Sequence, residues 1–192
     1  MTQKPSASPD ALKRPVPRGL KNPLCFKFSV RIENACSRSG MTLKRLSLDA
    51  GLSHSMASKM CVGSNMPSLE TIERLASAIG VSPGWLAYGY EGLEPFRERY
   101  PRPIVERSDP IPDDSLRVFR DLCAGFPDRL RLSRERCGLS MRSLSSAAGV
   151  SVQAWSIAEG GRVVPRVDTA ERMAVALGVA PSWLAFGEGI VN

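Results

Sequence analysis

An internal repeat is the feature that most constrains this chain. Residues 28–89 align with residues 126–187 without a gap, and 24 of the 62 aligned pairs are identical. The clearest stretch sets GVSPGWLAYG, at 80–89, against GVAPSWLAFG, at 178–187. A constant offset of 98 residues indicates a duplication, so the two copies are expected to share one fold.

Each copy has the hydrophobic period of a helical protein. Apolar residues recur at intervals of three and four, and short Gly, Ser or Pro segments divide them into runs of two or three turns. We therefore expect an all-α fold of two tandem five-helix domains. In the first copy the helices are expected at 28–38, 42–50, 53–61, 68–79 and 83–88. Thr42 and Ser53 are expected to cap helix starts, and Gly40, Gly51 and Gly80 to end helices in the left-handed conformation.

The segments outside the repeat have a different composition. Residues 1–24 hold five prolines and a net charge of +4, which predicts a flexible basic arm before a first domain at 25–89. The connection 90–125 carries a net charge of −2 and begins rich in proline. Near 114–124 it has acidic capping residues and an apolar stripe, which predict one extra helix that packs on its own domain or forms a dimer seam. The second domain is expected at 126–188.

Composition narrows the classes of function. A formal net charge of +7 and an isoelectric point near 9.5 favour an anionic partner, either nucleic acid or a membrane surface. No apolar run approaches the roughly 20 residues that span a bilayer, and no signal peptide is evident, so we expect a cytoplasmic protein that does not enter a membrane. Five cysteines without a C-x-x-C pair and a single histidine predict no metal or cofactor. No arrangement of residues indicates an enzyme or a catalytic site.

A helix-turn-helix pattern lies at the centre of each copy. The segment LSLDAGLS at 46–53 recurs as LSSAAGVS at 144–151, and a short helical run follows each. A small residue at Ala50 or Ala148 allows two helices to approach closely, and the next glycine permits the turn between them. The second helix then projects outward. A DNA major groove about 12 Å wide admits one such helix.

Each copy resembles the Cro/CI-type (XRE) helix-turn-helix domain of lambdoid phage repressors. The resemblance rests on the glycine-centred turn, the Gly-x-x-x-Pro loops at 63–67 and 161–165, and the ending Val-x-Pro-x-Trp-Leu-Ala-aromatic-Gly. It covers about two thirds of the chain. It implies a sequence-specific protein that binds a double-stranded DNA operator, most simply a transcriptional repressor of a phage or mobile-element operon.

The resemblance also implies which residues read bases. In the third helix of each copy they are His54, Ser55 and Lys59, and then Val152, Gln153 and Ile157. Lys59 can donate to guanine and Gln153 can pair with adenine, so both suit direct readout. The two aliphatic residues can only contact a thymine methyl, and they are equally consistent with a protein contact.

Further residues are implied to contact DNA phosphates at the start of the second helix and in the loop after the third. They are Thr42, Lys44, Arg45, Ser64 and Asn65 in the first copy, and Ser140, Arg142, Ser143, Arg162 and Arg166 in the second. The family's ion pair between the first and third helices matches Arg134 and Glu159, whereas the first copy has Cys36 and Cys61 there. These two thiols are expected to lie close together, and a disulfide that changes DNA affinity under oxidation is a hypothesis.

Two alternatives remain open at this stage. One chain could bridge an operator with its two domains, since a 36-residue connection can span two half-sites about 34 Å apart. A homodimer that reads DNA with its first copies, which we favour, would instead require a palindrome. A different class of function is an antitoxin or antiactivator, in which the second domain binds a protein partner.

Overall fold

The computed structural model describes residues 23–89 and 122–188, and within these ranges the chain is all-α as expected. Nearly all of the predicted basic arm lies outside them, as do residues 114–121 of the helix predicted near 114–124. The first unit contains α1 (Pro23–Ser39), α2 (Leu43–Asp49), α3 (Met56–Cys61), α4 (Leu69–Ile79) and α5 (Pro83–Tyr88). The second contains η2 (Leu122–Gly125), α8 (Phe126–Cys137), α9 (Met141–Ala148), α10 (Val152–Glu159), α11 (Val167–Leu177) and α12 (Pro181–Phe186).

Most of the predicted helix ends are found where the sequence indicated, but α1 begins at Pro23 and not at residue 28 as predicted. The Thr42 hydroxyl accepts a hydrogen bond from the backbone N–H of Arg45, and Ser140 caps α9 in the same way through Ser143. Gly51 and Gly149 make the turn inside each helix-turn-helix with φ angles of 64° and 63°. That left-handed conformation costs glycine least, because it has no Cβ to clash with the backbone.

The predicted start of the third helix is wrong in the first copy. Ser53 does not cap it: the backbone oxygen of Ser53 accepts from Met56 N (2.9 Å), and α3 begins only at Met56. In the second copy the equivalent Ser151 does cap, with its hydroxyl accepting from Ala154 N (3.0 Å), and α10 begins at Val152. The two third helices are therefore six and eight residues long.

A buried serine on the second helix, present in both copies, is bonded differently in the two. The Ser47 hydroxyl is fully buried and accepts a hydrogen bond from Ala57 N (3.0 Å), an N–H that the late start of α3 leaves without a helical partner. In the second copy the matching N–H of Trp155 bonds to the Ser151 carbonyl (3.0 Å) within α10. The hydroxyl of Ser145, the counterpart of Ser47, is then buried without a partner. Whether this serine hydroxyl has a backbone N–H to bind therefore goes together with where the third helix starts.

The two cores place the large side chain of the third helix at different positions. Ala57 and Met60 of α3 correspond to Trp155 and Ala158 of α10, and all four are buried. The small and the large side chain have exchanged places along one helix face, so the bulky residue lies one turn earlier in α10 than in α3.

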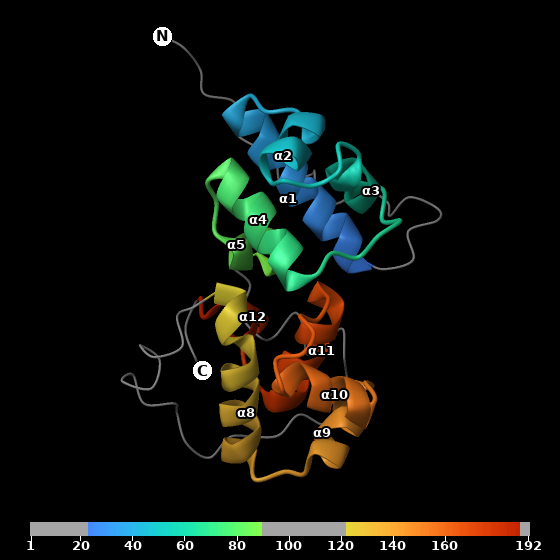
Figure 1. Cartoon of the computed structure of the whole chain (residues 1–192), viewed down its shortest axis with the longest axis vertical. Helices are drawn as coiled ribbons and strands as arrows, with labels where there is room; N and C mark the ends of the chain where they lie inside the picture. The colour runs from blue at the N-terminus through green and yellow to red at the C-terminus, as the bar shows by residue number, and fades with distance from the viewer. Residues whose placement is uncertain (1–22, 90–121, 189–192) are drawn as a thin grey trace.

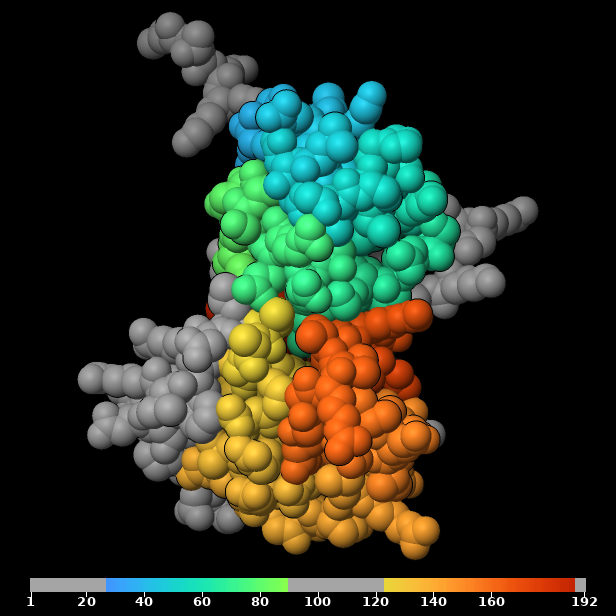
Figure 2. Space-filling view, viewed as in Figure 1, coloured from blue at the N-terminus to red at the C-terminus, as the bar shows by residue number. Residues whose placement is uncertain are grey.

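The two units pack against each other along the long axis of the molecule (Figures 1 and 2). Helix α5 lies against α12, and the backbones just before α4 and α11 form an antiparallel bridge between Ser68 and Arg166. Leu69 N donates to Pro165 O and Val167 N donates to Pro67 O, both at 3.0 Å. The bridge joins two residues that are 98 positions apart, and the two hydrogen bonds exchange when each residue is replaced by its counterpart in the other copy. The two copies therefore meet about a pseudo-two-fold axis.

Candidate nucleic-acid interface

Two arginines, one in each copy, hold the turn of the helix-turn-helix. Arg74 of α4 donates to the carbonyl of Gly51 (2.7 Å), and Arg172 of α11 donates to the carbonyl of Gly149 (2.9 Å). A cation at these carbonyls stabilises the C-terminal end of the preceding helix. Sequence reasoning missed both residues, although their identity across the repeat was a usable signal.

A second pair of arginines ties the first helix to the last helix of each copy. Arg129 is completely buried in α8 and donates to the carbonyls of Leu184 and Ala185, both at 2.9 Å. Arg31 in α1 makes the equivalent bonds at the end of α5, with 2.8 Å to Leu86 O. These contacts set the orientation of α5 and α12, the two helices that join the copies.

The residues expected to read bases reach the surface, although they do not all lie on helices. In the first copy His54 and Ser55 belong to the turn that precedes α3, because α3 starts late, and only Lys59 is on the helix. His54 and Lys59 are exposed and Ser55 is half-buried. In the second copy Val152 and Gln153 form the exposed first turn of α10. Ile157 follows on the same helix and is half-buried.

All ten residues expected to contact phosphates have exposed side chains, and they flank the third helix of their copy on both sides in sequence. Arg45 is the least free of them, because its Nε lies 2.9 Å from a carboxylate oxygen of Asp49. That ion pair is exposed, so it contributes little and can be exchanged for a phosphate. The Ser64 hydroxyl donates to the carbonyl of Lys59 (2.8 Å) and shapes the loop after α3.

The third helices of the two copies, α3 and α10, carry most of the residues expected to read bases and are called the readers below. Figure 1 shows both on one side of the molecule, with α2 and α9 toward opposite ends. The loops that follow α3 and α10 lead directly into the backbone bridge at Ser68 and Arg166. The C-terminal ends of both readers are thereby tied to the pseudo-two-fold axis.

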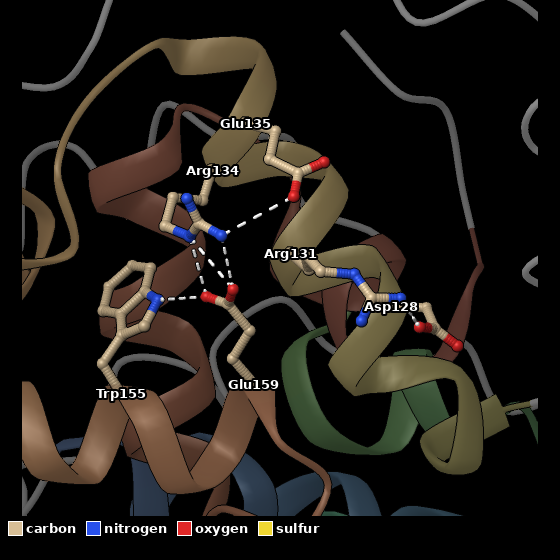
Figure 3. A network of polar contacts seen from close by, with 6 residues as sticks. All are labelled: Asp128, Arg131, Arg134, Glu135, Trp155 and Glu159. Carbon is tan, nitrogen blue, oxygen red and sulfur yellow. Dashed lines mark hydrogen bonds and ion pairs between the residues drawn. The ribbon is translucent and has the colours of Figure 1, made fainter.

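An ion pair fixes α10 on α8 in the second copy (Figure 3). Arg134 donates from Nη2 to Glu159 Oε1 (2.6 Å) and from Nε to Glu159 Oε2 (2.9 Å), and Trp155 Nε1 donates to the same carboxylate at 3.1 Å. The hydrogen bond to Glu159 raises the pKa of the Arg134 guanidinium above its ordinary value. Glu135 lies farther away, at 3.7 Å from Arg134. The ion pair thus holds α10 against α8.

The corresponding place in the first copy holds two neutral thiols. Cys36 is buried in α1, Cys61 closes α3, and both are free. Burial, followed by the nearby charge of Glu33 and by Cys36 itself, raises the pKa of Cys61 to about 12. Burial also raises the pKa of Cys36. Both groups therefore stay protonated at neutral pH, and a thiol is a poor nucleophile compared with a thiolate.

We expect iodoacetamide at pH 8 to modify Cys36 and Cys61 far more slowly in the folded protein than in urea. The pKa of Cys61 in the folded protein lies above the ordinary 9.0. The protonated thiol therefore stabilises the folded state fully below pH 9, and this stabilisation is lost as the pH rises toward 12. Peptide mass spectrometry after timed labelling measures the rates. Rapid labelling of the folded protein, or a disulfide formed without unfolding, would support the redox hypothesis instead.

Within residues 23–89 and 122–188, no group of three or more His, Cys, Asp and Glu side chains is placed to hold a metal ion. Over the same residues, none of the helices has the length and apolar character needed to traverse a lipid bilayer. The features that stand out on this part of the chain are the third helices of the two copies and the exposed polar and basic residues that flank them.

Comparison with known families agrees with this geometry. Residues 33–86 match a family model described as helix-turn-helix, and residues 126–185 match a second one described as a helix-turn-helix domain. No curated protein and no solved structure matches the chain. The two matched ranges fall on the two helical units, and helix-turn-helix domains of this kind bind DNA. The chain is therefore a tandem helix-turn-helix protein, with a DNA-binding domain of the Cro/CI type at 33–86 and a second helix-turn-helix domain at 126–185.

Proposed function

We propose that this protein is a transcriptional repressor that binds an operator by sequence and blocks the promoter of a phage or mobile-element operon, in the cytoplasm. The observation that carries the proposal is the pair of exposed readers on one side of the molecule, each flanked by side chains suited to phosphate. Lys59 and Gln153 supply direct readout of guanine and adenine. The basic and hydroxyl residues around them contact phosphates, which fixes the position of the protein on the duplex without any preference for sequence.

Selection of bound duplexes from a random pool tests the proposal. The wild type is compared with Lys59→Ala and with Gln153→Ala, because each change removes one reader's polar contact and leaves the fold intact. We expect an enriched sequence for the wild type, and loss of preference at different positions for the two variants. A pool that stays random at low salt would contradict sequence-specific binding. Placing the enriched sequence before a reporter promoter then separates repression from activation.

Arg142→Ala is expected to weaken binding to every sequence alike. Arg142 is exposed in the first turn of α9, where the resemblance places a phosphate contact and not a base contact. Each phosphate contact releases about one counterion, so the slope of log affinity against log salt should become shallower by about 1. Fluorescence anisotropy titrations between about 50 and 200 mM salt measure this slope. A change in sequence preference without a change in slope would assign Arg142 to base reading.

A second candidate function is a protein-interaction module of the antitoxin or antiactivator class, with the second domain as the binding surface. The observation that favours it is an apolar groove of about 650 Å³ beside α10, whose lining includes Ile157, Val163 and Val164. Val163 is 58% exposed and Val152, near the start of α10, is 44% exposed. A tight partner that co-purifies, together with no DNA shift at low salt, would favour this function over repression.

A further inference from the structure

We infer that a single copy of this chain occupies both halves of its operator, and that the operator consists of two unequal half-sites at a fixed spacing. The inference rests on the proposed function, because it concerns the DNA that the two readers bind. It replaces the homodimer that the sequence favoured with an internal pseudo-dimer.

The contact between the copies has the form of a two-fold dimer interface. Ser68 faces Arg166, and the aromatic rings of Tyr88 and Phe186 lie 6.4 Å apart between centroids. In both pairs the partners are equivalent positions of the repeat. Isologous contacts of this kind normally join two separate chains. Here one chain supplies both sides.

The surface that joins the copies is already covered. Tyr88 and Phe186 are 2% and 1% exposed, and Leu69 and Val167 beside the backbone bridge are 0% and 2% exposed. Most of α5 and α12 is likewise buried. A second chain could reach these helices only by displacing the copy that already covers them. That copy is covalently linked, so its effective concentration at this surface is very high.

The contacts of Glu188 favour pairing of unlike copies over pairing of two first copies. Glu188 accepts from Gly84 N (2.9 Å) and from the Ser82 hydroxyl at the start of α5. Its counterpart in the first copy is Tyr90, which has no carboxylate. Two first copies would lack the Glu188 contacts.

A glycine makes the close approach of α5 and α12 possible. A Cβ placed on Gly84 would lie 3.0 Å from the Cβ of Ser182, its own counterpart in the repeat. This separation is shorter than real Cβ contacts normally show. A larger side chain at Gly84 would therefore push the copies apart without straining α5 itself.

The interface fixes the distance between unlike readers. One reader presents His54, Ser55 and Lys59, and the other presents Val152, Gln153 and Ile157, so the two half-sites cannot be the same sequence. Because the copies are packed together and not merely tethered, the spacing between half-sites is set by the interface. Half-sites separated by one helical turn, about 34 Å, suit two readers on one side of a molecule.

The test uses the full chain and the duplex that it selects. Native mass spectrometry is expected to find one chain per duplex. Inserting about 5 base pairs between the half-sites should lower affinity about 100-fold or more, because the second reader then faces away and avidity is lost. Inserting about 10 base pairs restores the facing of the half-sites and should not restore affinity, since the interface cannot stretch.

A variant separates packing from tethering. Gly84→Leu should reduce the spacing penalty, and Asn34→Leu, which adds the same side chain at an exposed position on α1, should leave it unchanged. Two chains per duplex, or full affinity after the 10-base-pair insertion, would overturn this inference and leave DNA binding intact. Failure to bind any duplex would overturn the proposed function as well.

Discussion

Lys59→Ala is expected to lower affinity for the operator about tenfold to a hundredfold and to remove base preference in one half-site only. Lys59 is the exposed cationic residue on α3, and a good contact to guanine contributes about 1–3 kcal/mol of discrimination. The other half-site is read by α10 and should keep its preference. Affinity measured against a panel of single-base variants of the selected duplex gives both results.

Lys44→Ala is the matched control for that change. Lys44 is also an exposed lysine, but it lies at the start of α2, where phosphate contacts are proposed. Its removal should weaken binding to all panel members by a similar factor. If Lys59→Ala also acted uniformly, Lys59 would be a phosphate contact and the first copy would have no established guanine reader.

Glu159→Ala is expected to destabilise the second domain by about 2–3 kcal/mol. The Glu159 carboxylate is nearly buried and accepts hydrogen bonds from both Arg134 and Trp155, so its loss leaves a guanidinium and an indole N–H without their acceptor. Arg134 keeps some solvent contact, which reduces the cost below that of a fully buried charge. Urea unfolding followed by circular dichroism measures the change.

Glu135→Ala provides a control on the same arginine. Glu135 is 58% exposed and 3.7 Å from Arg134, so its removal should change stability by less than about 0.5 kcal/mol. A similar effect of both changes would mean that general charge, and not the buried carboxylate, holds α10 on α8. DNA binding by Glu159→Ala should also weaken, because α10 carries the second reader.

The repeat and its helical period predicted the architecture because both depend on local residue choices. Thr42, Ser140 and the turn glycines act within a few residues, and the structure has them as the sequence indicated. The late start of α3 was not predictable in this way. It is accompanied by a contact from ten residues earlier, in which the Ser47 hydroxyl accepts from the N–H of Ala57. The same serine stands in the second copy as Ser145 without that bond, so the residue alone does not indicate where the helix starts.

The candidate site was only partly predictable for a related reason. Exposure of the expected readers follows from the resemblance, but the contacts that orient them come from elsewhere in the chain. Arg74 and Arg172 act on turn carbonyls 23 residues away, and Arg129 acts across 55 residues. The packing of one copy on the other depends on Gly84 and on Glu188, which touch only after both copies have folded. No periodic pattern in the sequence encodes such contacts.

Hydroxyl-radical footprinting of the full chain on its selected duplex is the most direct measurement of the central claim, which is that the twin readers dock side by side on DNA. We expect two protected windows about 10 base pairs apart, on one face of the duplex, with different sequences in the two windows. A featureless cleavage pattern at about 50 mM salt, where phosphate contacts are strongest, would contradict the claim.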